Sequence, residues 1–214
     1  MGIFSRLIAC LLFLILIPAL LFVALISFVN QGSPIIFKQE RVGFKLKKFM
    51  IYKFRTMMTN NGPSITVTND KRVTRWGKFL RYLKLDELPQ IINIIKGDMR
   101  FIGPRPELPE FVETKSFSFL NKVPPGLSDY SSIIFRNESL VLNKIGGPDP
   151  YEKLLSYKIQ LAKFYSKRKS FIEDFILVLI TIIAIVFPSF TSRKLVLPFI
   201  IRKIPEFKKI DHLL

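Results

Sequence analysis

The sequence contains very little cysteine and histidine. Cys10 is the only cysteine in 214 residues, and His212 is the only histidine. A single cysteine excludes a disulfide framework, and a single histidine excludes a zinc site built from cysteine and histidine ligands. We expect no Ser-His-Asp triad either, since the one histidine lies at the extreme C-terminal end of the sequence.

Acidic residues are also scarce. Lys and Arg number 33 against 16 Asp and Glu, so the formal net charge is +17, yet 49% of the residues are hydrophobic. The hydrophobic content excludes a disordered basic tail. High positive charge together with high hydrophobicity is typical of a protein on an anionic bilayer, so inner-leaflet phospholipids are expected partners.

A long apolar run covers 7–29 and is interrupted only by Pro18 and Ser27. As a helix it would be about 34 Å long, enough to cross a hydrocarbon core of about 30 Å. A cleaved signal peptide is disfavoured, because the run is too long and no A-x-A-like site precedes Asn30. The run therefore predicts a membrane helix that either spans the bilayer or re-enters it.

Pro18 lies near the middle of this run and predicts a kink, because proline removes one helical hydrogen bond and clashes with the preceding turn. Each arm would reach only about halfway across the core, so a sharp bend would return both ends to one face. Positive charge is heavier after the run than before it, which places the following domain in the cytoplasm in either arrangement. From the residues alone, both arrangements stay open.

A second apolar run covers 171–190. Its uncharged core, 175–187, would form a helix of about 20 Å, which is too short to span. A span would also place the basic tail on the far side, against the positive-inside bias. We expect this run to lie in the membrane interface or partly buried against the domain, with a soluble core helix as the alternative. The tail at 195–210 is interpreted as another surface anchor.

The chain divides into a membrane helix at 1–30, a central domain at 31–169 that carries the candidate catalytic residues, and an interfacial segment at 170–214. This division follows the two apolar runs and the polar, basic stretch between them.

Several elements are predicted inside the central domain. Two extended stretches, 33–42 and 48–57, predict a pair of strands. A loop is expected at Asn60-Asn61-Gly62-Pro63. One helix is predicted from Asp70 to Leu83, and a second from Asp86 to Gly97.

Asp86 and Glu87 form an acidic pair directly after a strongly basic stretch. The predicted helix N-terminus at Asp86 would lower the pKa of its carboxyl group and favour anions nearby, so we expect Asp86 to be ionised with phosphates held beside it. The two carboxylates could also share Mg²⁺, which takes few protein oxygens and several phosphate oxygens. Ordinary capping of a helix start is the alternative.

Four basic residues are candidate ligands for substrate phosphate: Lys53, Arg55, Arg75 and Arg105. Arg105 lies between two prolines, and such rigid placement suits bidentate phosphate recognition. Lys53 and Arg55 are two residues apart in a predicted strand, so their side chains would point the same way. Arg75 belongs to the basic face of the first predicted helix. A solvated strand face and contact with lipid headgroups are the alternatives.

Short motifs follow one another in a fixed order: Gln39-x-Arg41-Val42-Gly43, Tyr52-Lys53-Phe54-Arg55-Thr56-Met57, Asn69-Asp70-x-Arg72-Val73-Thr74-x-x-Gly77, Leu85-Asp86-Glu87-Leu88-Pro89-Gln90, Lys96-Gly97-Asp98-Met99, Gly103-Pro104-Arg105-Pro106-Glu107 and Pro125-Gly126-Leu127. Each motif alone is weak. Together and in this register, over about 7–190, they resemble the bacterial sugar transferase family, the monotopic phosphoglycosyl transferases.

The resemblance implies an enzyme that moves a sugar-1-phosphate from a UDP-sugar to undecaprenyl phosphate and releases UMP. This would be the first membrane step in assembling a glycoconjugate or a polysaccharide. It implies that Asp86 is the nucleophile and forms a phosphosugar-aspartyl intermediate. Glu87 would assist metal binding or proton handling, and Mg²⁺ would be the cofactor.

The resemblance also implies a fold and a location. The fold would be a small, mostly helical α+β domain on a membrane, with an N-terminal re-entrant helix bent at Pro18 and interfacial amphipathic helices. The location would be the cytoplasmic face of the bacterial inner membrane, because the acceptor phosphate cannot leave its lipid. No nucleic acid partner is expected. The oligomeric state stays open, a homodimer included.

The sequence departs from the family pattern in places. Ile17-Pro18 replaces the usual Ser-Pro pair at the bend, and Ala162 stands where many members have an acid. The rival interpretation is a non-catalytic, membrane-anchored module that binds polyanions through charge. The acidic pair inside a basic field disfavours that module. Neither the sugar nor the nucleoside is identified by the sequence.

Overall fold

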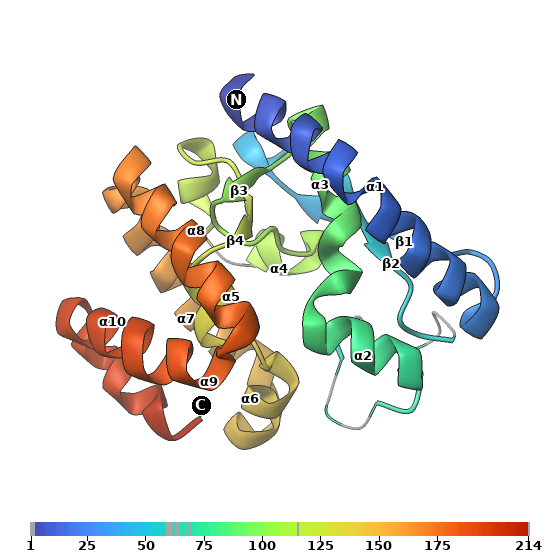
Figure 1. Ribbon diagram of the computed structural model, residues 1–214. Helices are drawn as coiled ribbons and strands as arrows, with labels where there is room; N and C mark the ends of the chain where they lie inside the picture. Colours follow the sequence, from blue (N-terminus) through green and yellow to red (C-terminus); the bar gives the residue numbers. More distant parts are fainter. Residues whose placement is uncertain are drawn as a thin grey trace.

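The computed structural model describes residues 3–58, 62, 65, 66, 68, 70–114 and 116–213 (Figure 1). It is mostly helical, with two small sheets, as the expected α+β class requires. Asn60, Asn61 and Pro63 of the predicted loop lie outside the described residues.

The strands are β1 (Ile36–Val42), β2 (Lys48–Phe54), β3 (Arg100–Ile102) and β4 (Gly126–Ser128). The helices of the N-terminal half are α1 (Ile3–Gln31), η1 (Phe44–Leu46), α2 (Arg75–Leu83), η2 (Leu85–Gln90), α3 (Ile91–Lys96) and α4 (Pro109–Thr114). Those of the C-terminal half are η3 (Ser118–Asn121), α5 (Tyr130–Ile134), α6 (Glu138–Ile145), α7 (Pro150–Arg168), α8 (Phe171–Val186), α9 (Pro188–Phe190), η4 (Thr191–Val196), α10 (Leu197–Lys203) and η5 (Pro205–Leu213).

The predicted strand pair is confirmed, with strands somewhat shorter than expected. β1 and β2 are antiparallel, and their register pairs Ile36 with Phe54 and Val42 with Lys48. The second sheet pairs β3 with β4 in parallel. Because both of these strands run the same way, the loop that follows β3 and the residues that follow β4 lie at one edge.

α1 is one uninterrupted helix and lies along one side of the domain (Figure 1). Its first half packs through Ala9 on Ile94, and its second half packs through Val23 on Leu80. It is long and apolar enough to cross a membrane by length and composition alone. The structure does not show the expected sharp bend at Pro18, which is exposed on the outer side of α1. Packing of both halves on one body holds the helix together across the missing hydrogen bond.

Both ends of α1 are tied to the same domain. Near its start, Arg6 Nε donates to Ile95 O at 2.8 Å. Near its end, Trp76 Nε1 donates to Ser27 Oγ at 2.9 Å. The outer face is apolar and open, with Leu14 64% and Leu25 62% exposed. An exposed apolar surface of this size is typical of a site for lipid or for another protein.

α8 is partly buried against the domain. Leu177 and Ala184 are buried on its inner side, and the Ser128 and Thr181 hydroxyls lie 2.7 Å apart. Its outer side exposes large apolar residues such as Phe171 and Ile182. The partly buried alternative therefore describes α8 better than a soluble core helix does.

The residues that follow α8 fold back onto the domain. Leu197, Ile200, Phe207 and Ile210 are buried in the main hydrophobic core. The basic residues of this segment are all exposed: Arg193, Lys194, Arg202, Lys203, Lys208 and Lys209. The segment is thus a folded part of the domain with a basic outer surface.

The first predicted helix begins later than expected. α2 starts at Arg75, capped by Thr74 Oγ1, which accepts from Gly77 N at 2.8 Å. The predicted cap, Asp70, instead binds Arg72 at 2.7 Å. A bridge between Met57 and Val73 holds the intervening backbone extended, which explains the delayed start.

The second predicted helix is two elements. The residues from Leu85 to Gln90 form the 3₁₀ helix η2, and α3 follows from Ile91. Pro89 lies inside η2, where it cannot donate to a helical ladder. Gly97 ends α3 with a positive φ of 89°, as its predicted position at the helix end requires.

Gly77 marks the closest approach of α2 to the backbone before it. A Cβ placed there would lie 2.1 Å from Thr56 O. We expect Gly77→Ala to lower the free energy of unfolding by about 1–3 kcal/mol, because α2 would have to move away. Denaturant unfolding in detergent measures this. Lys78→Ala, exposed on the same helix, is the control, with a change within about 0.5 kcal/mol. Equal stability of the two variants would contradict the expectation.

Candidate active site

The acidic pair lies in η2, directly after α2. Lys84 takes a left-handed conformation, with φ of 61°, which ends α2 and turns the chain into η2. Asp86 is 7% exposed and Glu87 is 9% exposed. The turn therefore places two adjacent carboxyl groups inside the protein and not in bulk solvent.

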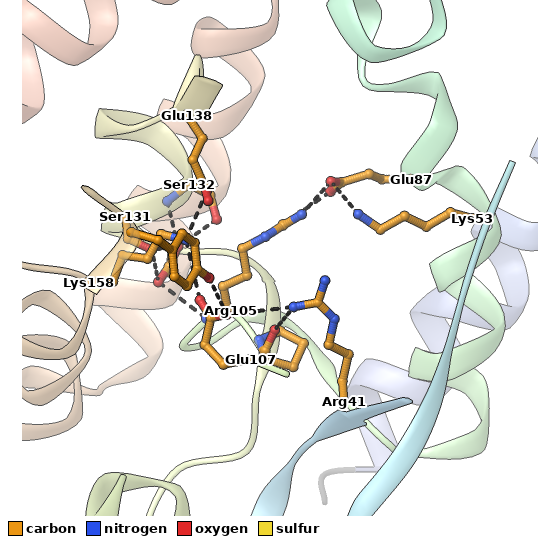
Figure 2. A network of polar contacts seen from close by, with 12 residues as sticks. Arg41, Lys53, Glu87, Arg105, Glu107, Ser131, Ser132, Glu138 and Lys158 are labelled. Atoms are coloured by element: carbon orange, nitrogen blue, oxygen red, sulfur yellow. Dashed lines mark hydrogen bonds and ion pairs between the residues drawn. The ribbon is translucent and has the colours of Figure 1, made fainter. Parts of the chain in front are cut away.

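Glu87 is held by two cations (Figure 2). Arg105 Nη2 lies 2.5 Å from Glu87 Oε1 and Arg105 Nη1 lies 3.3 Å from Oε2, while Lys53 Nζ lies 3.2 Å from Oε1. Burial opposes ionisation of Glu87, but the charges of Arg105 and Lys53 outweigh it and hold the pKa of Glu87 well below its usual value. Glu87 is therefore a fixed, ion-paired carboxylate.

Asp86 differs from its neighbour. Its Oδ1 is buried and has no hydrogen-bond partner within the described residues. Burial, and then the charge of Glu87, raise the pKa of Asp86 above its usual value, although Lys53 and Lys84 act in the opposite direction. The predicted lowering of this pKa is wrong, because η2 is short and burial outweighs any helix-end effect. Asp86 Oδ1 is therefore free to react or to bind.

The loop after β3 presents Arg105. Arg105 N donates to Asp129 Oδ2 at 3.4 Å, and Asp129 also caps α5 by accepting from Ser132 N at 2.7 Å. A Cβ on Gly126 would lie 2.1 Å from Gly103 N, so the two strand ends can meet only with glycine there. The close approach of the two strands thus places the loop so that Arg105, which lies between two prolines, points toward Glu87.

A second ion network lies behind Arg105 (Figure 2). Glu107 accepts from the Tyr151 hydroxyl at 2.7 Å and from Lys158 Nζ at 3.3 Å. Lys158 Nζ also lies 2.8 Å from Glu138, and Arg41 Nη1 lies 3.6 Å from Glu107. The sequence placed Glu107 in a motif without a role of its own. It gave no indication of Lys158, because nothing in the neighbouring residues distinguishes this lysine and its partner Glu107 lies 51 residues away.

Two of the four predicted phosphate ligands lie elsewhere. The Arg55 guanidinium donates to the carbonyl groups of Gln31 and Gly32, at the end of α1. Arg55 follows the last residue of β2, so the strand alternation that would align it with Lys53 no longer applies. Arg75 is exposed in the first turn of α2. The structure brings Lys53 and Arg105 to Glu87, but does not bring Arg55 or Arg75 there.

A pocket adjoins this cluster on the side of α5 and α6. It is lined by Lys84, Arg105, Ser131, Ser132, Phe135, Arg136, Glu138 and Lys158. Arg136 closes one side, with its Nη2 donating to Tyr82 O at 3.0 Å. Cations dominate the lining, so the pocket suits an anionic group.

A magnesium ion at this site would depend mainly on Asp86. In the described part of the chain, no three His, Cys, Asp or Glu side chains gather as a possible metal site. Both Glu87 oxygens are engaged by cations, whereas Asp86 Oδ1 is free. One carboxylate oxygen fits an ion that takes most of its remaining ligands from substrate phosphate and water.

Known proteins are similar to parts of this sequence. The model of the family described as "Bacterial sugar transferase" matches residues 2–188. A UDP-N-acetylgalactosamine-undecaprenyl-phosphate N-acetylgalactosaminephosphotransferase of Aeromonas hydrophila is 40% identical over 125 residues, which cover 55% of this chain and 30% of that protein. A UDP-glucose:undecaprenyl-phosphate glucose-1-phosphate transferase of Escherichia coli is 32% identical over 167 residues, 74% of this chain and 35% of that protein.

An exopolysaccharide production protein of Rhizobium leguminosarum is 46% identical over 96 residues, 43% of this chain and 48% of that protein. The matched segments thus span about a third to a half of these relatives. The family model covers most of the present chain, including every residue of the cluster around Glu87. The chain belongs to the bacterial sugar transferase family.

Proposed function

We propose that this protein transfers a sugar-1-phosphate from a UDP-sugar to undecaprenyl phosphate and releases UMP. The observation that carries the proposal is the free, buried oxygen of Asp86 beside a neighbour whose charge is already balanced by Arg105 and Lys53. Relatives named as undecaprenyl-phosphate sugar phosphotransferases support the same reaction. The product would enter glycoconjugate or polysaccharide assembly.

The reaction runs in two displacements. An Asp86 carboxylate oxygen attacks the β-phosphorus of the UDP-sugar, and the bond from that phosphorus to the bridging oxygen breaks, so UMP leaves with the electron pair. The sugar phosphate is then bound to Asp86. An oxygen of undecaprenyl phosphate attacks the same phosphorus, and the bond to Asp86 breaks, which restores the carboxylate. Lys53 and Arg105 stabilise the charge that develops on the phosphoryl oxygens.

Mg²⁺ is proposed as the cofactor. Asp86 would hold it together with donor phosphate oxygens, and Glu87 would act mainly by keeping Arg105 and Lys53 in place. When bound, the ion supplies charge neutralisation for the diphosphate.

The membrane arrangement is proposed to be monotopic, on the cytoplasmic face of the bacterial inner membrane. Arg6 and Ser27, near opposite ends of α1, both contact the catalytic domain. A helix held this way cannot place its two ends on opposite sides of a bilayer while the domain stays on one side. The exposed apolar faces of α1 and α8 would enter the lipid, and the basic C-terminal surface would contact phospholipid headgroups.

Asp86→Asn tests the nucleophile. We expect UMP release from a UDP-sugar in the presence of undecaprenyl phosphate to fall at least about a thousandfold, because an amide cannot form the covalent intermediate. Asp149→Asn, an exposed aspartate, is the matched control and should keep its activity. Mass spectrometry of the acid-quenched wild type should show a sugar phosphate on the peptide that contains Asp86. An active Asp86→Asn variant would refute the assignment.

Removal of divalent metal tests the cofactor. We expect chelation with EDTA to abolish UMP release and excess Mg²⁺ to restore it, since Asp86 and the donor phosphates would lose the ion that they share. Full turnover after exhaustive chelation would contradict the proposal without affecting the assignment of Asp86.

Cysteine labelling tests the membrane arrangement. In a Cys10→Ser background, which has no other cysteine, Ser5→Cys and Asn30→Cys mark the two ends of α1. We expect a membrane-impermeant thiol reagent to label neither in intact spheroplasts and both after permeabilisation. Lys153→Cys, exposed on α7, is the control for the cytoplasmic side. Labelling of either end of α1 in intact spheroplasts would show a spanning helix.

A further inference from the structure

Lys158 is buried behind Arg105 and faces two carboxylates. Its side chain is 7% exposed, Nζ lies 3.3 Å from Glu107 Oε1 and 2.8 Å from Glu138 Oε2. Burial opposes its charge, but Glu107 and Glu138 outweigh burial and raise the pKa of Lys158. Lys158 is therefore a buried cation that pairs both with Glu138 of α6 and with Glu107, the residue directly after the Pro-Arg-Pro loop.

Arg105 has more than one carboxylate within reach of its charge. Glu87 raises the pKa of Arg105 most, against burial, and Glu138 and Asp129 add to the effect. Glu138 and Lys158 line the same pocket as Arg105. Without a cation on Glu138, the flexible Arg105 side chain would have an alternative partner on the side away from Glu87.

Lys158 removes this competition. It pairs with Glu138 and also, together with Arg41, with Glu107, so both carboxylates behind Arg105 are balanced (Figure 2). Asp129 is engaged by the hydroxyl groups of Ser131 and Ser132, and the Arg105 guanidinium binds Glu87 through two nitrogens. Buried ion pairs such as those of Lys158 are often no more stabilising than hydrophobic residues of similar size. A contribution to stability alone therefore does not account for Lys158.

We propose that Lys158 is a positioning residue: by holding Glu107 and Glu138, it keeps Arg105 directed at Glu87 and at the phosphates of the donor. The inference rests on the proposed function and assigns a role to a residue outside the acidic pair and the Pro-Arg-Pro loop. In this role, Lys158 acts through the position of Arg105 and not through direct contact with the reacting atoms of the substrate.

A double-variant cycle tests the proposal on the full-length protein in detergent. We expect Lys158→Met to lower kcat/KM for the UDP-sugar about 100-fold per folded molecule, since a small misplacement of a phosphate-binding group costs about that much. Adding Glu138→Gln removes the competing carboxylate, so Lys158→Met/Glu138→Gln should recover about tenfold. Glu138→Gln alone completes the cycle. Lys163→Met, exposed on the same helix, is the matched control and should behave as wild type.

Thermal unfolding of each variant is measured beside its activity, at a temperature where all are folded. A purely structural role predicts lower unfolding temperatures with unchanged kcat/KM per folded molecule, and this result would overturn the proposal. So would a Lys158→Met variant that loses activity but recovers nothing when Glu138→Gln is added. Should Lys158→Met not fold, Lys158→Gln, which keeps a polar head without the charge, replaces it in the cycle.

Failure of this inference is separable from failure of the proposed function. Wild-type protein that releases no UMP from any UDP-sugar would refute the proposed function itself. Wild-type turnover together with unaffected Lys158→Met turnover would refute only the positioning role.

Discussion

The ion pair between the buried Glu87 and the partly exposed Arg105 is the contact on which the site depends. Glu87 comes from the turn between α2 and α3, and Arg105 comes from the loop after β3. Loss of Glu87 would leave Arg105 and Lys53 without their shared carboxylate, and loss of Arg105 would leave Glu87 with Lys53 alone. The pair thus joins two segments of the chain and also fixes the roles of two adjacent acids. Glu87 takes the cations, and Asp86 is left with a free oxygen.

The membrane sets the second constraint. In the proposed reaction, a lipid-linked acceptor would bring its phosphate only to the depth of the headgroups, so Asp86 would have to lie close to the bilayer surface. α1 meets this need by lying on the domain, with one face packed on α3 and the other open. The same helix whose outer apolar face is proposed to enter the lipid also supports α3, which directly follows η2 and its acidic pair. The proposed anchor and the proposed catalytic site therefore belong to one folded body.

Local patterns in the sequence predicted a good part of this structure. The strand pair and the apolar character of α1 and α8 follow from short-range signals, whereas the contact of Arg105 with Glu87 joins residues 18 positions apart and forms only in the folded chain. The start of α2 could not be predicted, because the Met57 and Val73 bridge that delays it forms only in the folded chain. Arg55 turns to α1 since β2 ends one residue before it. The pKa of Asp86 depends on burial, and Lys158 meets Glu107 across 51 residues.

The folded segment after α8 has a consequence for where this protein can be shortened. The family match ends at residue 188, yet Ile200, Phe207 and Ile210 lie beyond it and fill the main core. Phe207 packs edge-on against Tyr157 of α7, with ring centroids 5.4 Å apart. A chain cut at residue 188 would lose these core residues. The apolar side chains of α7 that they cover, such as Tyr157, would then be exposed to water. In this protein the minimal folding unit is larger than the family's shared region.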